Sequence, residues 1–359
     1  MSGSHAQWAE GFMKHSTHHV ELLSLPGRHW KWRMYGAGPE LAHQFMDMEY
    51  EPELVLATDL MDLSVFCGLS RNKLKNVSVA LYFHENQLCY PWSNRDPDTK
   101  SGRNRHYAFI NLQSAIAADK VFFSSAYQRT SFLNALPAFL KAFPDQRLKW
   151  SVDQIAEKSS VLHLGIELEE NSLNGSYRNT VPYIIWNHRW EYDKNPDLFF
   201  NTLIGLSEEG VSFKLIVTGE SYGEAPPIFA VAKEKLAQHI VHWGFASSRK
   251  IYLELLKQAD IIPVSNEQDF FGISVIEAVW AGAEPLLPER LAYPEIFGDT
   301  TSYYQDDGSF VEQLRIKISE HSANEINQKR LERLSKFSWR EMIKEWDNSL
   351  YNTVYRQIE

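Results

Sequence analysis

Short apolar runs alternate along this chain with longer segments in which apolar residues recur every three or four positions. The runs have the composition of buried strands, and they lie at residues 20–24, 54–58, 77–82, 120–123, 161–164, 182–186, 213–218, 240–243 and 260–265. Strands that alternate with helices predict parallel sheets with helices on both faces. We therefore predict an α/β protein, and its 359 residues are enough for two domains of ordinary size.

A polar stretch at residues 167–180, rich in Asn, Glu and Ser, separates two series of these elements and predicts a linker. It divides the chain into an N-terminal domain of residues 1–166 and a C-terminal domain of residues 181–336. Residues 337–359 then predict an amphipathic helix that packs across the neighbouring domain. Its apolar stripe is formed by Met342, Ile343, Trp346, Leu350 and Val354.

The charge and the cysteines limit the class of protein. The formal net charge is −10, so the whole surface is not that of a nucleic-acid binder, and contact with nucleic acid needs a local basic patch. Cys67 and Cys89 have no metal-ligand spacing and are expected to be buried thiols in a reducing compartment. No apolar run approaches a membrane span, and the start is too polar for a signal peptide. We expect a cytoplasmic protein without a membrane partner, and no segment indicates an oligomeric state.

Two carboxylates mark the segment that follows the apolar run at 260–265. Asp269 lies in the loop, and Glu277 lies one turn inside a helix that Gly272 opens, with seven residues between the two acids. A helix N-terminus offers unpaired N–H groups and the positive end of a dipole, which suits phosphate. Glu277 points back toward that end, where a carboxylate is tolerable if it holds neutral groups such as sugar hydroxyls and if cations lie close by. The alternative is an amphipathic helix with a solvated Glu277.

Cations and glycines follow other strands of the second half. Arg189 and Lys194 lie on the loop after residues 182–186, where a pair of phosphates would need neutralising, although cations on a loop are commonly solvated. Gly219 ends the next strand. Gly244 allows a tight turn after residues 240–243 that suits backbone contacts to a base.

A polar cluster of His84, Glu85, Asn86 and Gln87 directly follows the apolar run at 77–82. In open α/β sheets, ligands bind beyond the carboxyl ends of strands. A lone histidine there would commonly be structural, but four polar side chains together indicate a functional site.

Cations and indoles alternate between Arg28 and Arg33. We expect this segment to be a loop that grips phosphates and stacks on bases, or else a segment whose tryptophans pack inward. Residues 92–106 lose all periodicity and are net basic. They predict an irregular loop, which is either a lid, a partner-binding loop or a plain surface excursion.

The chain begins with a Gly-containing turn at Gly3, Ser4 and His5, which opens a helix from Ala6 to about His15. In a doubly wound sheet such a turn follows the first strand. No strand precedes it here, so either that strand is cut off or the sheet is built without it. The alternative is a frayed end in which Ser4 caps the helix.

Together these blocks resemble the retaining glycosyltransferases of family four, which have the GT-B fold of two Rossmann-like domains facing a cleft. The resemblance rests on Arg189 and Lys194 and on the acidic pair Asp269 and Glu277. A narrower resemblance, to the tRNA-queuosine mannosyltransferase group, is carried by residues 3–8, 25–34, 82–87, 269–272 and 293–297. These blocks span nearly the whole chain.

The resemblance implies transfer of mannose from GDP-mannose to queuosine in tRNA, with retention of configuration and without a metal or other cofactor. Glu277 would bind the donor's ribose, Asp269 the hydroxyls of the transferred sugar, and His84 would lie beside that sugar. Donor binding would also use Arg189, Lys194, Gly219, Gly244, Phe245, Gly272, Ile273 and Ser274. Acceptor binding would use Gly3, Ser4, His5, Arg28, Trp30, Lys31, Trp32, Arg33, Glu85, Asn86, Gln87 and Arg105.

This chain departs from the family in two ways. The family has Glu at the first acidic position, whereas Asp269 is one methylene shorter, and the family has a strand before the Gly-Ser-His turn. Two other functions therefore stay open. One is a family-four transferase with a small-molecule or glycan acceptor, and the other is a truncated, non-catalytic homologue that binds nucleotide sugar or tRNA.

Overall fold

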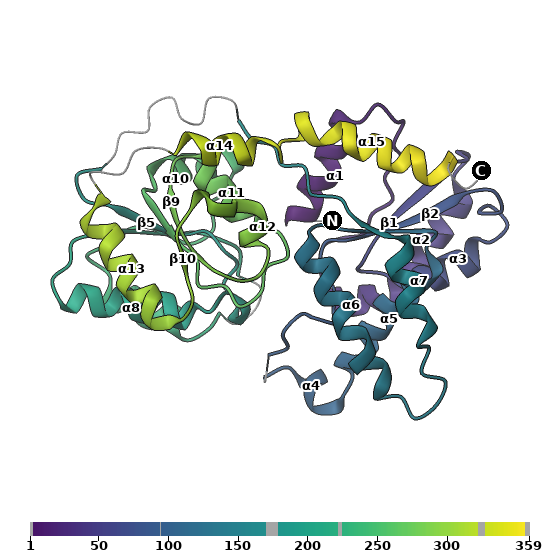
Figure 1. Ribbon diagram of the computed structural model, residues 1–359, viewed down its shortest axis with the longest axis horizontal. Coiled ribbons are helices and arrows are strands. Elements are labelled where there is room, and N and C mark those ends of the chain that lie inside the picture. Colours follow the sequence, from purple (N-terminus) through teal and green to yellow (C-terminus); the bar gives the residue numbers. More distant parts are fainter. Residues whose placement is uncertain (1–2, 94, 170–178, 222–224, 322–326, 356–359) are drawn as a thin grey trace. The chain divides into compact units, whose positions relative to one another are not determined.

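The computed structural model describes residues 3–93, 95–169, 179–221, 225–321 and 327–355. The chain divides into two compact units (Figure 1). Unit 1 comprises Met1–Glu167 and Phe337–Glu359, and unit 2 comprises Leu168–Lys336. Each unit contains one parallel β-sheet.

The sheet of unit 1 has four strands in the order β1-β2-β3-β4, and every neighbouring pair is parallel. The strands are β1 (Leu54–Thr58), β2 (Ser78–Phe83), β3 (Lys120–Phe123) and β4 (Ser159–Val161). The helices of this unit are α1 (Gly3–His15), α2 (Trp30–Asp47), α3 (Leu63–Ser70), α4 (Pro97–Ser101), α5 (Asn104–Ala117), α6 (Ala126–Lys141), α7 (Trp150–Lys158) and α15 (Trp339–Tyr355).

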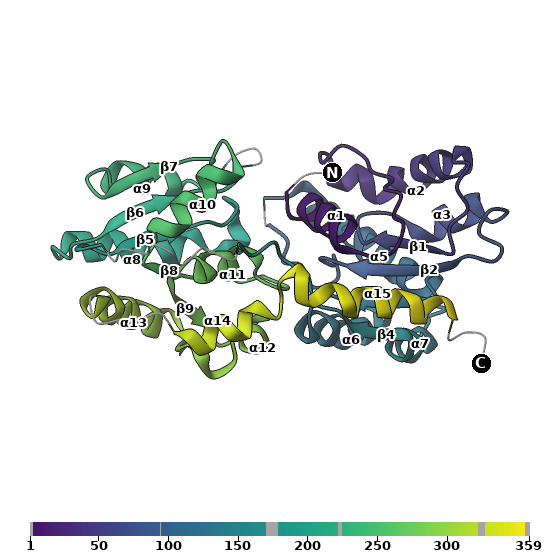
Figure 2. The same ribbon diagram turned by 90° about the horizontal axis from the view of Figure 1, so that it is seen from above.

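Alternation along β2 sends side chains to the two faces of this sheet. Val79, Leu81 and Phe83 join a core with the apolar side chains of α2, α3, α5, α6 and α7. Phe83 stacks on Phe123 with ring centroids 4.9 Å apart. Tyr82 points to the opposite face, and that face is covered by α1 and α15, which lie side by side (Figures 1 and 2).

The C-terminal helix α15 belongs to unit 1 although it follows unit 2 in sequence, as the resemblance to the GT-B fold predicts. Its Trp346 ring lies 4.8 Å from the Tyr82 ring and 5.5 Å from the Trp8 ring of α1. Trp339 fills a slot lined by two glycines. A Cβ on Gly11 would lie 2.0 Å from this indole, and a Cβ on Gly165 would lie 2.3 Å from it. Helix α15 therefore docks by aromatic packing into a slot that only glycines leave open.

The sheet of unit 2 has six parallel strands in the order β10-β9-β8-β5-β6-β7. The strands are β5 (Tyr183–Trp186), β6 (Lys214–Val217), β7 (Ile240–Trp243), β8 (Ile261–Pro263), β9 (Glu284–Pro288) and β10 (Tyr303–Tyr304). The α-helices are α8 (Pro196–Glu208), α9 (Ile228–Lys235), α10 (Arg249–Gln258), α11 (Ile273–Trp280), α12 (Tyr293–Phe297), α13 (Asp307–Ser319) and α14 (Gln328–Ser335). Two 3₁₀ turns, η1 (Tyr192–Lys194) and η2 (Gly298–Thr300), complete the unit.

The core between this sheet and helices α8, α9 and α13 contains a cluster of aromatic residues among aliphatic ones. Trp186 of β5 is fully buried, and its ring centroid lies 5.0 Å from Phe199, 5.6 Å from Phe200 and 5.7 Å from Phe229. This packing holds the end of β5 rigidly. The loop that follows β5 carries Arg189 and Lys194.

Three local predictions are wrong. Residues 20–24 form no strand, and Leu23 is partly buried against the core of unit 1. The basic segment is not a loop throughout: His29 takes the left-handed conformation and α2 begins at Trp30. The irregular stretch at 92–106 contains α4 and the start of α5.

The predicted linker lies largely outside the described residues, at 170–178. Among the described residues, no strand precedes α1, and the first strand of the sheet is β1. In the part of the chain that the structure describes, no helix is both long and apolar enough to cross a membrane.

Candidate functional site

The loop after β8 and the first turn of α11 form the centre of the predicted site in unit 2. Gly272 opens α11 with a φ of 88°, in the left-handed region that favours glycine. A Cβ at this position would also lie 3.0 Å from the Tyr293 ring. The first N–H groups of α11, at Ile273 and Ser274, have no partner within the helix and face its open N-terminal end.

Glu277 is buried, with 7% of its surface exposed, so the alternative of a solvated carboxylate is wrong. Arg249 Nη2 donates to Glu277 Oε1 at 2.6 Å, and the Tyr252 hydroxyl donates to Oε2 at 2.9 Å. Burial and the Glu277 charge raise the pKa of Tyr252 well above its ordinary value, so this hydroxyl stays a donor. Burial alone would lower the pKa of Arg249, but the Glu277 charge and hydrogen bond raise it.

Asn187, directly after β5, links Tyr252 to the first turn of α11 through two hydrogen bonds. Its Nδ2 donates to the Ser274 carbonyl at 2.7 Å and to the Tyr252 hydroxyl at 3.2 Å. The sequence analysis missed Asn187, Arg249 and Tyr252. Asn187 follows an apolar strand and could have been found by that signal, whereas the two residues of α10 carry no motif.

Asp269 is fixed through one of its two carboxylate oxygens. Oδ2 accepts hydrogen bonds from the Tyr293 hydroxyl at 3.0 Å and from Asn266 Nδ2 at 3.1 Å, and it lies 4.0 Å from Lys194 Nζ. Phe271 N donates to Oδ1 at 3.4 Å. The sequence analysis did not predict Tyr293 or Asn266 as site residues.

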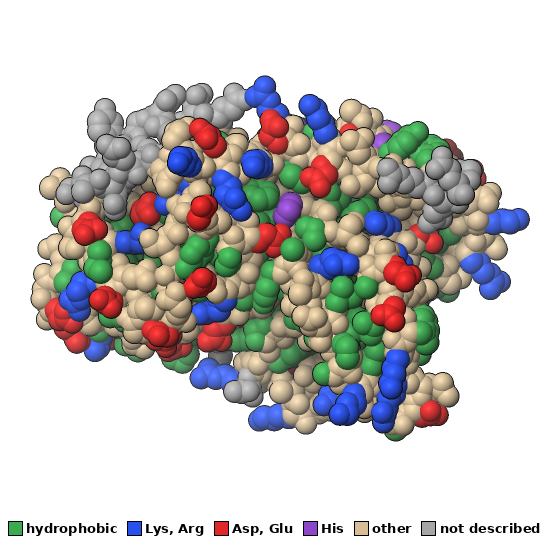
Figure 3. Space-filling view, viewed as in Figure 1, with side chains coloured by type: hydrophobic (Ala, Val, Ile, Leu, Met, Phe, Trp, Pro, Cys, Tyr) green, Lys and Arg blue, Asp and Glu red, His purple; other side chains and the backbone are tan. Residues whose placement is uncertain are grey.

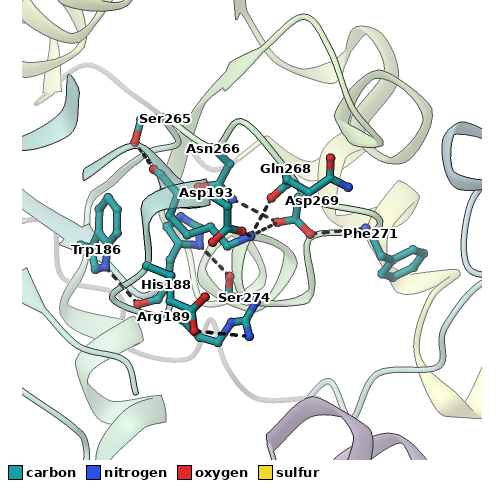
Figure 4. A network of polar contacts seen from close by, with 12 residues as sticks. Trp186, His188, Arg189, Asp193, Ser265, Asn266, Gln268, Asp269, Phe271 and Ser274 are labelled. Atoms are coloured by element: carbon teal, nitrogen blue, oxygen red, sulfur yellow. Dashed lines mark hydrogen bonds and ion pairs between the residues drawn. The ribbon is translucent and has the colours of Figure 1, made fainter. Parts of the chain in front are cut away.

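Lys194 lies at the end of η1 and is buried. Its ammonium donates to the Gln268 carbonyl at 2.7 Å and forms an ion pair with Asp193 at 3.1 Å. Arg189 is more exposed and lies 3.8 Å from Glu191. Figure 4 shows Asp193, Asn266, Gln268 and Asp269 in one network, near His188, Arg189 and Ser274.

His188 is a further member of this network that the sequence analysis did not predict. It is buried, and its Nδ1 lies 3.1 Å from Ser274 Oγ. Burial, together with the nearby Lys194 charge, lowers the pKa of His188 to about 3, so its ring is neutral at physiological pH. Gly219 passes close to this residue, because a Cβ there would lie 2.1 Å from the His188 carbonyl oxygen.

Gly244 and Phe245 follow the end of β7. Gly244 has a φ of 125°, and a Cβ on it would meet no atom within 4 Å. Phe245 is 64% exposed, which is unusual for a large apolar ring. Gly244 N donates to the Val217 carbonyl at 2.9 Å, and its carbonyl oxygen lies 2.9 Å from His242 Nε2. The exposed ring of Phe245 is therefore the group here that is open to a base, rather than the Gly244 backbone.

In unit 1, His84 lies in an aromatic surround at the carboxyl end of β2. Its ring centroid is 4.3 Å from that of His5, 4.6 Å from Trp8 and 4.9 Å from Tyr82. Burial lowers the pKa of His84 well below its ordinary value, and the neighbouring His5 lowers it further. The structure thus brings together two predicted residues, His5 at the start of α1 and His84.

Asp59, which follows β1, holds the backbone of the polar cluster at residues 84–87 through hydrogen bonds. Its Oδ1 accepts from the backbone N–H of His84 at 2.8 Å and from that of Glu85 at 3.4 Å. Burial, with the Glu85 charge adding to it, raises the pKa of Asp59 well above its ordinary value. Asn111 Nδ2 donates to the Asp59 carbonyl at 2.9 Å, and its Oδ1 accepts from Gln87 N at 2.7 Å. The sequence analysis missed both supporting residues.

Glu85 and Gln87 are joined by a hydrogen bond of 3.1 Å from Gln87 Nε2 to Glu85 Oε1. Asn86 is buried, and its Oδ1 accepts from Cys89 N at 2.9 Å. At the start of α1, Gly3 and Ser4 are exposed.

The basic-aromatic segment lies partly at the surface of unit 1. Trp32 is 64% exposed, and Trp30 is partly covered by Trp92 and Tyr107. Lys31 is held by ion pairs to Asp96 at 2.6 Å and to Asp98 at 2.7 Å. Burial alone would lower the pKa of Lys31, but its bonds to these two acids raise it. Among the other predicted cations, Arg28 and Arg105 are exposed and Arg33 is half-buried.

No group of three or more His, Cys, Asp or Glu side chains in the described ranges is arranged to hold a metal ion. The described polar groups of unit 2 instead combine a helix N-terminus, a buried carboxylate between two donors, and a second carboxylate beside a lysine. Such a combination can bind a phosphorylated, hydroxyl-rich molecule.

Comparison with known proteins gives two family matches and several curated relatives. Residues 1–166 match the family described as tRNA-queuosine alpha-mannosyltransferase N-terminal, and residues 170–336 match glycosyl transferases group 1. A tRNA-queuosine alpha-mannosyltransferase of Drosophila melanogaster is 34% identical over 311 residues, which cover 84% of this chain and 80% of that protein.

Solved structures share the fold at low sequence identity. The Candida albicans trehalose-6-phosphate phosphatase N-terminal domain has a TM-score of 0.67 at 12% identity, covering 98% of this chain and 82% of that one. Sucrose-phosphate synthase from Thermosynechococcus elongatus has a TM-score of 0.62 at 14% identity, with 94% and 82% covered. Anabaena HepE, solved with UDP and glucose, has a TM-score of 0.60 at 13% identity, with 87% and 81% covered.

Two parallel-sheet units, a C-terminal helix that returns to the first, and the group 1 match define a glycosyltransferase with the GT-B fold. The predicted fold class is thereby confirmed. The relative of Drosophila and the N-terminal match narrow the class further: the chain belongs to the tRNA-queuosine alpha-mannosyltransferase family. The predicted family is also confirmed.

Proposed function

We propose that this glycosyltransferase moves mannose from GDP-mannose to queuosine in tRNA, with retention of the anomeric configuration and without a metal ion. The proposal rests mainly on one observation: the two parts of the chain match two different families. Residues 170–336 match glycosyltransferases in general, whereas residues 1–166 match a family described only by tRNA-queuosine mannosylation. The first unit is therefore the part that specifies the acceptor.

The donor binds to unit 2 in this proposal. The ribose hydroxyls donate to Glu277, whose carboxylate Arg249 and Tyr252 already orient. The diphosphate accepts hydrogen bonds from the first N–H groups of α11, and Lys194 and Arg189 balance its charge. Phe245 contacts the base, and the transferred sugar donates hydroxyls to Asp269.

The proposed mechanism of transfer is built around the negative charge that develops on the leaving diphosphate. The bond between the anomeric carbon and the diphosphate oxygen breaks, and its electron pair leaves with GDP. An acceptor hydroxyl attacks on the face that the diphosphate leaves, which retains the configuration, and its proton passes to the departing diphosphate. The helix terminus and the two cations stabilise the negative charge on the leaving group. In the proposal His84 contacts the sugar, and because burial lowers its pKa, the neutral ring adds no charge there.

The tRNA binds to unit 1 through a local patch, because the chain as a whole is acidic. Figure 3 shows Lys and Arg side chains gathered around α4 and along the neighbouring lower edge of unit 1. Arg28 and Arg105 are exposed cations, and Trp32 offers an open ring for stacking. Lys31 is already neutralised by Asp96 and Asp98, so its contribution is to hold the segment in place.

The test incubates the protein with GDP-mannose and queuosine-containing tRNA, digests the tRNA, and measures nucleoside masses. A hexose added to queuosine, released as mannose in the α configuration, is expected. The same tRNA without queuosine and the free queuosine nucleoside serve as acceptor controls. Transfer to a small molecule or glycan but not to the tRNA would contradict the proposal, as would the use of UDP-glucose in place of GDP-mannose.

A further inference from the structure

The side-chain hydrogen bonds that the Asp269 carboxylate receives both reach the same oxygen, Oδ2. Oδ2 receives the Tyr293 hydroxyl at 3.0 Å and Asn266 Nδ2 at 3.1 Å, and Lys194 Nζ lies 4.0 Å away. One carboxylate oxygen has about two lone-pair sites for hydrogen bonds, so Oδ2 has no room for another donor. Oδ1 receives only the 3.4 Å bond from Phe271 N among the described residues.

Tyr293 and Asn266 form a closed triangle with Asp269. Asn266 Nδ2 donates one hydrogen to Asp269 Oδ2 and the other to the Tyr293 hydroxyl, at 2.9 Å, and that hydroxyl donates to Oδ2. Tyr293 and Asn266 are both fully buried. Burial and the Asp269 charge raise the pKa of Tyr293 well above its ordinary value, so the hydroxyl remains a donor across the physiological range.

The Tyr293 ring is fixed as well as its hydroxyl. It packs against Gly272, where a Cβ would approach the ring to 3.0 Å and Asp269 Oδ2 to 3.8 Å. The residue that opens α11 is thus shaped to admit the tyrosine beside the carboxylate. The Tyr293 hydroxyl oxygen therefore cannot move away from Asp269 Oδ2 without moving this ring.

We infer that Tyr293 is a positioning residue for the transfer reaction: its hydroxyl holds Asp269 Oδ2 so that Oδ1 faces the hydroxyls of the transferred sugar. The inference rests on the proposed function, since it needs Asp269 to contact the sugar. It assigns to Tyr293 the orientation of the Asp269 carboxylate, through the hydrogen bond to Oδ2. Positioning of this kind acts on the sugar and leaves the nucleotide unaffected.

The experiment compares Tyr293→Phe with Tyr304→Phe. Tyr304 is a matched control, because it is equally buried and its hydroxyl donates to a backbone carbonyl, that of Val264, at 2.8 Å. Loss of one hydrogen bond to a charged group predicts that kcat for mannose transfer falls about tenfold in Tyr293→Phe, which corresponds to about 1.4 kcal/mol. The Kd for GDP, which lacks the sugar, should stay within about twofold in both variants.

A double-mutant cycle separates positioning from general loosening. In an Asp269→Asn background, Tyr293→Phe should lower kcat by less than about threefold, because the carboxylate that it orients is gone. Equal losses of kcat in Tyr293→Phe and Tyr304→Phe, or a full additional loss in the Asp269→Asn background, would overturn the inference.

A crystal structure of Tyr293→Phe provides a readout that does not depend on the substrates. The Asp269 carboxylate is expected to rotate or to occupy more than one orientation, while Asn266 keeps its place. An unchanged Asp269 overturns the inference whichever donor the enzyme uses. A wild-type enzyme that transfers no mannose to tRNA, with Asp269 displaced in the variant, would defeat only the proposed function.

Discussion

Replacing Glu277 by Gln tests whether this carboxylate binds the nucleotide or only joins α10 to α11. Its two oxygens accept from Arg249 at 2.6 Å and from Tyr252 at 2.9 Å in the structure. A ribose would add two hydroxyl donors to the same carboxylate, and each hydrogen bond to a charged acceptor is worth about 1.5–3 kcal/mol. Gln keeps the size, loses the charge and replaces one acceptor by a donor.

We expect Glu277→Gln to weaken GDP binding by about 2–3 kcal/mol, since one of the two bonds is lost and the other becomes neutral. That loss is roughly a 30- to 150-fold increase in Kd. Isothermal titration calorimetry with GDP measures it, and thermal unfolding in the same buffer shows that the variant is folded. Glu254→Gln is the matched control, because Glu254 lies exposed on α10 and should bind GDP as the wild type does.

A folded Glu277→Gln variant that binds GDP within about threefold of the wild type would refute the reasoning. The contacts with Arg249 and Tyr252 would then be the whole role of the carboxylate. A variant that loses GDP binding but keeps its thermal stability would instead support the reasoning that Arg249 and Tyr252 orient Glu277 for ligand binding.

Three further predictions follow from packing, protonation and exposure. Gly165→Ala places a Cβ 2.3 Å from Trp339 and should destabilise the protein by about 1–3 kcal/mol in chemical unfolding, whereas Gly68→Ala, with no atom within 4 Å, should not. In the unfolded chain His188 binds a proton below about pH 6.5, whereas in the folded state its pKa is lowered to about 3. As the pH falls between these two values, His188 therefore lowers the free energy of unfolding by about 1.4 kcal/mol per pH unit. His188→Asn should flatten the measured slope by that amount, and an unchanged slope would contradict it. Trp32→Ala should weaken tRNA binding by about 1–3 kcal/mol in a filter-binding assay, while Trp150→Ala, which removes another exposed indole, should leave it unchanged.

Periodicity and turn residues predicted the alternation of strands and helices, although they did not predict β9 and β10. The apolar runs at 54–58, 77–82, 182–186 and 240–243 correspond to strands, because a buried parallel strand is continuously apolar and its limits are local. The segment around residues 20–24 was misread for the same reason. Its Val20, Leu22 and Leu23 make an apolar run, yet Leu22 is 41% exposed, and whether a sheet edge pairs with such a run is not a local property.

The site was predictable only where residues lie next to one another in sequence. His84 and the three residues after it, and Asp269 with Gly272, were predicted because they follow apolar strands or open a helix. Asp59 was missed although it holds the backbone of His84, because 25 residues separate the two and a lone aspartate after a strand is common. Lys31 was predicted to contact an acceptor, and only the fold reveals that Asp96 and Asp98 already surround it.

By itself, the sequence determined two α/β sheets, a phosphate-suited helix terminus at Gly272 and the pair of acids near it. Those features depend on the spacing of neighbouring residues, which sets strand, loop and helix directly. The tertiary structure alone decided what each acid contacts: Arg249 and Tyr252 at Glu277, and Tyr293 and Asn266 at Asp269. Most of these partners come from other helices, 24 to 28 residues away, and packing of whole elements, which no local pattern encodes, brings them within hydrogen-bond distance.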